Sequence, residues 1–128
     1  MQLKYFPVNE RPRAWFIDLD GTLLRQNDRW PEIVIEHPKE ALLPGVLKKL
    51  AEIHMRGDYI VITTARPEPY RGITEWQLRT AGIMYHCLLM GLPTGQRILV
   101  NDRKVEEKTD MAIAINLNRD EGMEGVEI

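Results

Sequence analysis

Five short apolar runs restrict the fold of this chain more than any other feature of its sequence. Apolar residues dominate each run, which is typical of strands that are covered on both faces of a sheet. The runs lie at residues 14–17, 59–63, 84–90, 98–100 and 111–117. They predict a mostly parallel, five-stranded sheet inside an α/β domain.

Two helical patterns connect the first three runs. Pro44 can open the first helix, and apolar residues follow at helical spacing until Gly57 closes it. In the second, Thr74 and Gln77 have the spacing of a capping box, which predicts a helix from near Thr74 to Gly82. Strands that alternate with helices favour a parallel sheet between layers of helices.

The connection between the third and fourth runs is too short for a crossover helix. It consists of GLPTGQ, residues 91–96, whereas a parallel neighbour normally needs about a dozen residues or more. Two arrangements remain open: the strands pair as a hairpin, or the loop crosses the end of the sheet without a helix. There is no repeat or linker, so we predict one domain over residues 1–128, with the two ends as its flexible parts.

The composition narrows the classes of function. The 128 residues carry a net charge of -2, without the basic excess that binds a nucleic-acid backbone. No apolar run approaches the length of a membrane span, and residues 1–13 lack the apolar stretch of a signal peptide. Cys87, the single cysteine, is expected to fill space in the core. We therefore expect a cytoplasmic protein without a membrane partner. The net charge gives no support for a nucleic-acid partner, although it does not exclude one.

Polar residues that can carry chemistry directly follow three of the predicted strands. They are Asp18 and Asp20 after the first, Thr64 and Arg66 after the second, and Asp102 after the fourth. The carboxyl ends of parallel strands meet at one edge, where ligands bind in open α/β sheets. Carboxylates, a hydroxyl and a cation at that edge are the groups that a divalent cation and a phosphorylated substrate require.

Three segments resemble motifs of the haloacid dehalogenase superfamily. FIDLDGTLL, residues 16–24, is similar to the first motif, a hydrophobic strand followed by Asp-x-Asp-Gly-Thr. VITTARP, residues 61–67, is similar to the second motif, and ILVNDRK, residues 98–104, to the acidic fourth. They occur in the order of the family. The resemblance implies a Rossmann-like three-layer sandwich, and the short connections between the motifs leave no room for a cap domain.

The resemblance also implies roles for individual residues. Asp18 would be the nucleophile that forms an aspartyl-phosphate and would also bind Mg²⁺. Asp20 would be the general acid and base, with its backbone carbonyl on the metal. Thr64 would bind a phosphoryl oxygen, and Asp102 would complete the metal shell. The implied activity is that of a Mg²⁺-dependent phosphatase, which hydrolyses phosphomonoesters.

The sequence departs from the family pattern at one position. The third motif is a lysine, and short members often read Gly-Lys-Pro there, whereas this chain has Leu92. Arg97 is the nearest cation, but about five residues of strand at roughly 3.3 Å each would place it about 16 Å from the chemistry. Lys104 leaves the same strand end as Asp102, so we predict that Lys104 binds the phosphate, with Arg66 assisting.

The substrate is constrained by the absence of a cap. An open site needs a flap, at residues 25–30, a second subunit of a homo-oligomer, or a bulky substrate to exclude water. The tail AIAINLNRDEG, residues 112–122, resembles short members associated with surface-polysaccharide synthesis, which favours a small phosphorylated substrate such as a sugar phosphate. Two alternatives stay open: a polynucleotide 3'-phosphatase, against which the acidic balance argues, and a catalytically impaired phosphate-binding or regulatory protein.

The tryptophans and histidines carry weaker signals. Trp15 and Trp76 occupy apolar-periodic positions and are expected in the core. Trp30 lies in a polar loop, where packing and substrate contact both remain open. The histidines are scattered without the spacing of metal ligands, so we expect them to be structural or exposed.

Overall fold

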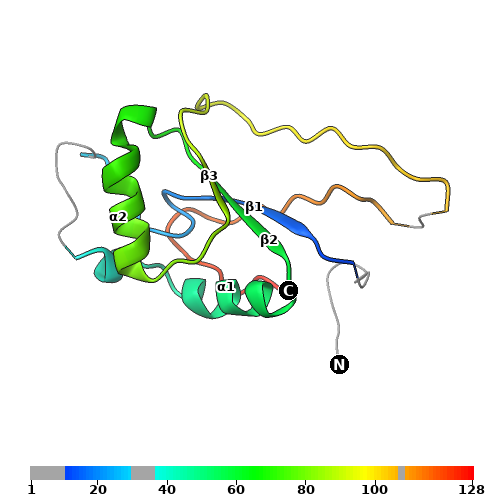
Figure 1. Ribbon diagram of the computed structural model, residues 1–128, viewed down its shortest axis with the longest axis horizontal. Coiled ribbons are helices and arrows are strands. Elements are labelled where there is room, and N and C mark those ends of the chain that lie inside the picture. Colours follow the sequence, from blue (N-terminus) through cyan, green and yellow to red (C-terminus); the bar gives the residue numbers. More distant parts are fainter. Residues whose placement is uncertain (1–10, 30–36, 107–108) are drawn as a thin grey trace.

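The computed structural model describes residues 11–29, 37–106 and 109–128 (Figure 1). In these ranges, strands and helices alternate along the chain. The elements are β1 (Ala14–Asp18), a 3₁₀ turn η1 (Pro38–Ala41), α1 (Val46–Met55), β2 (Tyr59–Thr63), a 3₁₀ turn η2 (Glu68–Tyr70), α2 (Arg71–Ala81) and β3 (Cys87–Leu89). None of the helices described is long and apolar enough to cross a membrane.

The three strands form a parallel sheet in the order β1-β2-β3. Asp18 pairs with Thr63, and Thr63 with Leu89, so the strands end together at one edge. The prediction of a mixed α/β fold with a parallel sheet is confirmed. The five-stranded sheet is not observed, because residues 98–100 and 111–117 have no strand partner in the part of the chain that the structure describes.

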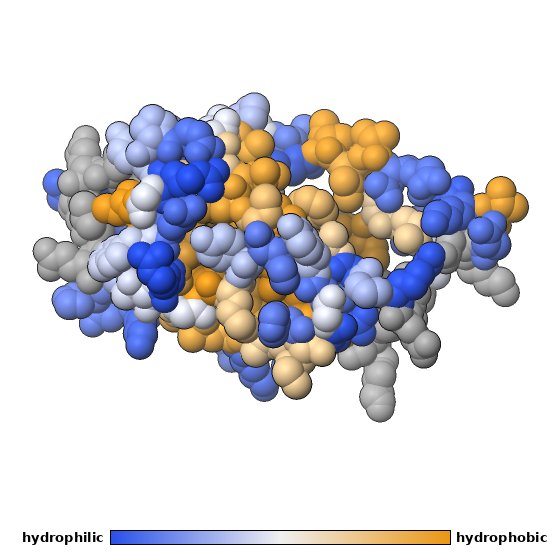
Figure 2. Space-filling view, in the orientation of Figure 1, coloured by the Kyte–Doolittle hydropathy of each residue, from blue (hydrophilic) through white to orange (hydrophobic). Residues whose placement is uncertain are grey.

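The chain leaves the sheet after β3 and forms an extended arm, residues 91–106 and 109–117. Figure 1 shows the arm, in yellow and orange, running out and back on the side away from α2. Ile98 and Val100 are 81% and 88% exposed, and Figure 2 shows hydrophobic side chains gathered on this part of the surface. No helix follows β3 in the described residues, and residues 98–100 do not pair with β3 as a hairpin would require. The connection after β3 is therefore neither a crossover helix nor a hairpin loop.

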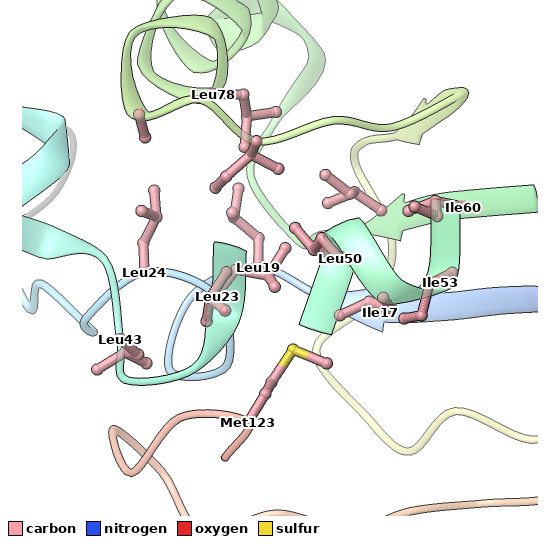
Figure 3. Packing of buried hydrophobic residues seen from close by; sticks show 14 of the residues in the cluster. Ile17, Leu19, Leu23, Leu24, Leu43, Leu50, Ile53, Ile60, Leu78 and Met123 are labelled. Atoms are coloured by element: carbon pink, nitrogen blue, oxygen red, sulfur yellow. The ribbon is translucent and has the colours of Figure 1, made fainter. Parts of the chain in front are cut away.

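The core lies on one face of the sheet. Ile17, Ile62 and Leu88 are neighbours across the strands, and they pack with side chains of α1, α2 and the C-terminal segment (Figure 3). On the opposite face Phe16 is 57% exposed, and Leu89 is exposed too. Right-handed crossovers in this strand order put both helices on the same face. The prediction of strands covered on both faces is therefore wrong for β1 and β3. It holds for β2, where Val61, on the same face as Phe16, is buried as well.

Glycines end both helices, as the sequence predicts. Gly57 and Gly82 each have a φ of 82°, the left-handed conformation that favours glycine at a helix end. The beginning of α2 differs from the prediction, since it starts at Arg71 and not near Thr74. Thr74 and Gln77 do not form a capping box but lie inside the helix, fully buried. Buried polar side chains need hydrogen-bond partners, so these two must serve another group.

The C-terminal segment, residues 118–128, packs against the body of the protein, although the sequence suggested a flexible end. Met123 lies in the core, and its amide donates to the carbonyl of Pro44 (2.8 Å). The amide of Asp120 donates to the carbonyl of Gly21 (2.8 Å). The segment thereby reaches the turn that follows β1.

Two side chains expected in the core lie elsewhere. Trp76 is 39% exposed on α2, and Cys87 is half-buried on the open face of the sheet. Trp15 does pack against the core, and its indole nitrogen donates to Asp58 (3.0 Å). Trp30 lies outside the described residues. Apolar type alone therefore does not predict on which face a residue lies.

Candidate active site

The chain turns sharply where β1 ends. The carbonyl of Leu19 accepts hydrogen bonds from three amides of the turn, those of Thr22, Leu23 and Leu24. Gly21 has a φ of 90°, which glycine adopts without steric cost. Leu19 is buried in the core (Figure 3), which leaves Asp18 and Asp20, on either side of it, closer to the surface. The turn thus presents two carboxylates at the edge of the sheet.

Asp18 is the last residue of β1 and is exposed. The hydroxyl of Thr22 donates to its carboxylate (3.4 Å). Partial burial of the carboxyl raises the pKa of Asp18, and the neighbouring charge of Asp20 adds to this rise. The Leu19 amide, Arg97 and the Thr22 hydroxyl lower the pKa, but by less. A solvent-facing carboxylate at a strand end can serve as a nucleophile or as a metal ligand.

Asp20 is bound by Arg66 through two hydrogen bonds. Nε of Arg66 donates to Oδ2 (2.9 Å), and Nη2 donates to Oδ1 (2.8 Å). Nη1 donates to Thr74 (3.1 Å) and to Gln77 (2.7 Å) of α2. Arg66 is 4% exposed. Its guanidinium therefore faces Asp20 and α2, and a direct role of Arg66 in phosphate binding stays a prediction.

Two threonines lie side by side at the end of β2. Thr64 is buried, and its hydroxyl oxygen accepts a hydrogen bond from the Arg66 amide (3.1 Å), which stabilises the loop after β2. Its predicted bond to a phosphoryl oxygen stays a prediction. Thr63 pairs with Asp18 across the sheet, so both side chains point to the same face. The sequence analysis selected neither Thr22 nor Thr63 as a site residue, although the register of two predicted strands could have indicated that Thr63 lies beside Asp18.

The loop after β3 lies beside the loop after β2. The Gly91 amide donates to the carbonyl of Arg66 (2.8 Å), and the Leu92 amide donates to the carbonyl of Thr64 (3.2 Å). Leu92 thus stands next to the residues of the second motif. A side chain at this position borders the candidate site.

The positive charge of Arg97 lowers the pKa of Asp18, although burial of the carboxyl outweighs this effect. Its Nη1 donates to the carbonyls of Pro93 and Gly95 (2.8 and 3.0 Å), which fold the side chain back over the loop. The sequence analysis excluded Arg97 because it assumed that a strand separates it from the site. No strand begins at Arg97 in the described residues, so the separation that was assumed is not observed, and which cation binds the phosphate stays a prediction.

Asp102 and Lys104 belong to the arm, and both are exposed. Within the described ranges, the structure gathers no group of three histidine, cysteine or acidic side chains that could hold a metal ion. The two aspartates of the turn after β1 are thus in place, whereas the arm does not bring a third acid to them. The roles of Asp102 in metal binding and of Lys104 in phosphate binding stay predictions.

A surface hollow of about 540 Å³ lies at the other end of β3. Its lining includes His54, Tyr85 and His86, which precede β3 or come from α1. The amide of Ile60 donates to Nδ1 of His86 (2.9 Å), and the His86 ring stacks on Tyr59 with centroids 4.5 Å apart. His86 therefore has a structural role, and the hollow is separate from the carboxyl edge of the sheet.

Comparison with known proteins gives little further information. No protein-family model matches this chain, and no curated protein matches it. A crystal structure of a target protein from Vibrio cholerae aligns with 73% of this chain and 82% of its own, at 24% sequence identity and a TM-score of 0.47. So distant a likeness establishes neither fold nor function.

Proposed function

We propose that this protein is a Mg²⁺-dependent phosphomonoester hydrolase that works through an aspartyl-phosphate. The substrate is a small phosphorylated metabolite such as a sugar phosphate. One observation carries the proposal: the exposed carboxylate of Asp18 ends β1, and two residues later Arg66 holds the carboxylate of Asp20. The resemblance of the surrounding motifs to the haloacid dehalogenase superfamily supports it.

The proposed reaction has two steps. An oxygen of Asp18 attacks phosphorus, the bond from phosphorus to the ester oxygen breaks, and the alcohol leaves with a proton from Asp20. Water then attacks phosphorus and gives a proton to Asp20, while the acyl-phosphate bond breaks and inorganic phosphate leaves. The Thr22 hydroxyl, which donates to Asp18, orients the attacking carboxylate. Exposure of Asp18 permits a phosphate group to reach it.

The donor chemistry fits a hard cation, since carboxylate and carbonyl oxygens are the ligands that Mg²⁺ prefers. Asp18, the backbone carbonyl of Asp20, and Asp102 would hold it. When bound, the cation would neutralise negative charge on the phosphoryl group. The proposal includes the larger, five-stranded Rossmann-like sheet. Among the described strands β1 lies at the edge, and the exposed apolar residues 98–100 would add to it. That pairing would carry Asp102 toward the edge where Asp18 lies.

The test is hydrolysis of p-nitrophenyl phosphate with and without Mg²⁺. We expect turnover that depends on Mg²⁺ and is lost in Asp18→Asn, which removes the nucleophile without changing the size of the side chain. Glu127→Gln is the control, because Glu127 is an exposed acidic residue of the C-terminal segment, and it should keep full activity. Equal turnover by Asp18→Asn and the parent protein would contradict the proposal. A 3'-phosphorylated oligonucleotide assayed against sugar phosphates separates the nucleic-acid phosphatase from the metabolite phosphatase.

The second candidate is a phosphate-binding or regulatory protein without turnover. It is favoured by Leu92, which stands beside the second-motif loop where the family places a lysine, and by the engagement of Arg66 with Asp20. Calorimetric titration with inorganic phosphate and Mg²⁺ distinguishes the two functions. Binding without hydrolysis of any phosphomonoester would favour this candidate.

A further inference from the structure

Arg66 lies at the centre of a buried network that joins the turn after β1 to α2. Among the described residues, its side chain donates two hydrogen bonds to Asp20, one to Thr74 and one to Gln77. Thr74 and Gln77 are fully buried and lie three residues apart, so they share one face of α2. Polar side chains with so little exposure are retained in a helix where a partner satisfies them. Here the guanidinium of Arg66 donates to the side-chain oxygens of both residues.

We propose that Arg66 is a positioning residue, which fixes the orientation of the Asp20 carboxylate at the site and is itself held by Thr74 and Gln77. The proposal rests on the proposed function, since it assigns Arg66 a task in the reaction of Asp20. Arginine suits this task, because its planar guanidinium binds both oxygens of a carboxylate at once. The ammonium group of a lysine, which is a point charge, could not fix the plane of the carboxylate in this way.

The burial of Arg66 separates this role from direct phosphate binding. Its surface is nearly all covered, and the face of the guanidinium that could meet a phosphate is occupied by Asp20. A phosphate group would have to displace a partly buried carboxylate that makes two charge-assisted hydrogen bonds. Asp20, by contrast, is 25% exposed through its side chain, so it can reach substrate while Arg66 stays behind it.

The two roles give different kinetic results in Arg66 variants. If Arg66 positions Asp20, Arg66→Gln should lower kcat about 100-fold, the contribution of a well-placed acid-base group, with KM unchanged. Arg66→Lys keeps the charge but loses the two-point contact, and it should restore only part of the loss. Competitive inhibition by inorganic phosphate should stay the same. A rise in KM and a loss of phosphate inhibition, with kcat kept, would overturn the proposal in favour of phosphate binding.

The role of α2 is tested at Gln77, which touches Arg66 and lies away from the substrate side. Gln77→Leu should lower kcat about tenfold with KM unchanged, because the guanidinium loses one anchor. Arg79→Gln, at an exposed arginine on the same helix, is the control and should keep full activity. An equal effect of both variants, or none at Gln77, would remove α2 from the proposal.

A double-mutant cycle shows whether Arg66 acts through Asp20. In the Asp20→Asn background, Arg66→Gln should cause no further loss of kcat, because the group that it positions is gone. A full further loss would overturn the proposal. Millimolar guanidinium ion should restore kcat in Arg66→Ala. The ion can enter the space left by the arginine side chain, where Asp20, Thr74 and Gln77 remain to bind it. Absence of turnover in the parent protein would instead defeat the proposed function, and with it the role of Arg66.

Discussion

At the scale of single residues, Asp58 shows how strongly one carboxylate can join distant parts of this chain. Its side chain is fully buried and accepts hydrogen bonds from the Arg13 amide (2.9 Å), the Trp15 indole (3.0 Å) and Arg56 (3.1 Å). Burial by itself raises the pKa of Asp58, but these hydrogen bonds together outweigh it, so the pKa lies below its usual value. Asp58 thus ties the start of β1 to the turn before β2.

The lowered pKa of Asp58 predicts a pH-dependent loss of stability. A carboxyl whose pKa is depressed by folding stabilises the folded state above its unfolded pKa, about 3.9. That contribution is lost as the pH falls through the lower, folded pKa. We expect Asp58→Asn to reduce the free energy of unfolding by about 3 kcal/mol at pH 7. Its stability should also fall less steeply than that of the parent protein below about pH 4.

Urea unfolding at pH 7 and at pH 3 measures both effects. Glu127→Gln serves as the control at an exposed position and should follow the parent protein at both values. A parallel fall of stability in Asp58→Asn and the parent protein would show that other carboxyls dominate the acid response.

Gly122 is a second residue whose identity the fold requires. It has a φ of 86°, and a Cβ atom placed on it would lie 2.3 Å from the carbonyl oxygen of Pro44. Gly122→Ala should lower the free energy of unfolding by about 2 kcal/mol or more, through backbone strain and the clash. Gly125→Ala, in the same segment but with nothing within 4 Å of such a Cβ, should change it by less than about 0.5 kcal/mol. Equal destabilisation of the two variants in thermal unfolding would contradict this account.

At the scale of elements, local signals predicted some boundaries and misled at others. The two glycines that follow the helices were predicted correctly, because a left-handed residue ends a helix wherever it occurs. The beginning of α2 was wrong because Thr74 and Gln77 fit a capping box as well as a buried anchor. Their actual partner is Arg66, which lies eight residues before Thr74 and eleven before Gln77. No local sequence pattern indicates this contact.

The loop after β3 gives a prediction about the missing lysine. Since the Leu92 amide binds the carbonyl of Thr64, a lysine side chain at position 92 would start beside the second-motif loop. Leu92→Lys should therefore raise turnover of an aryl phosphate about tenfold and tighten inhibition by inorganic phosphate, as a cation near developing charge does. Leu92→Met, of similar size without charge, should match the parent protein. If Leu92→Lys changed neither turnover nor inhibition by inorganic phosphate, residue 92 would not lie near the phosphate.

At the scale of the whole molecule, the sequence predicts the parallel sheet and the two aspartates at its edge, but not which apolar runs join the sheet. Residues 98–100 are as apolar as β1, yet they lie exposed in the arm. Strand pairing depends on contacts between distant segments, and the composition of one segment does not specify its neighbour. Within the ranges that the structure describes, the sheet consequently has an open edge at β1 and an open face around Phe16, while the arm carries unburied apolar side chains.

These open surfaces bear directly on the proposed metal site, because Asp102 reaches Asp18 only if the arm approaches β1. We expect Mg²⁺ to slow amide hydrogen exchange at residues 98–102, since a shared cation would favour the paired arrangement of the arm. Asp102→Asn should abolish this protection while leaving exchange in β2 unchanged.

Light scattering at the same protein concentrations shows whether the arm pairs with β1 of its own chain or with β1 of a second copy. Protection without a change in mass means that the arm pairs with β1 of its own chain. A doubled mass means that it pairs with a second copy, which would also cover the open site. Unchanged exchange at residues 98–102 under saturating Mg²⁺ would remove Asp102 from the metal site. Asp18 and Asp20 would then be left to bind the cation without it, and the acid that follows the fourth apolar run would need another explanation.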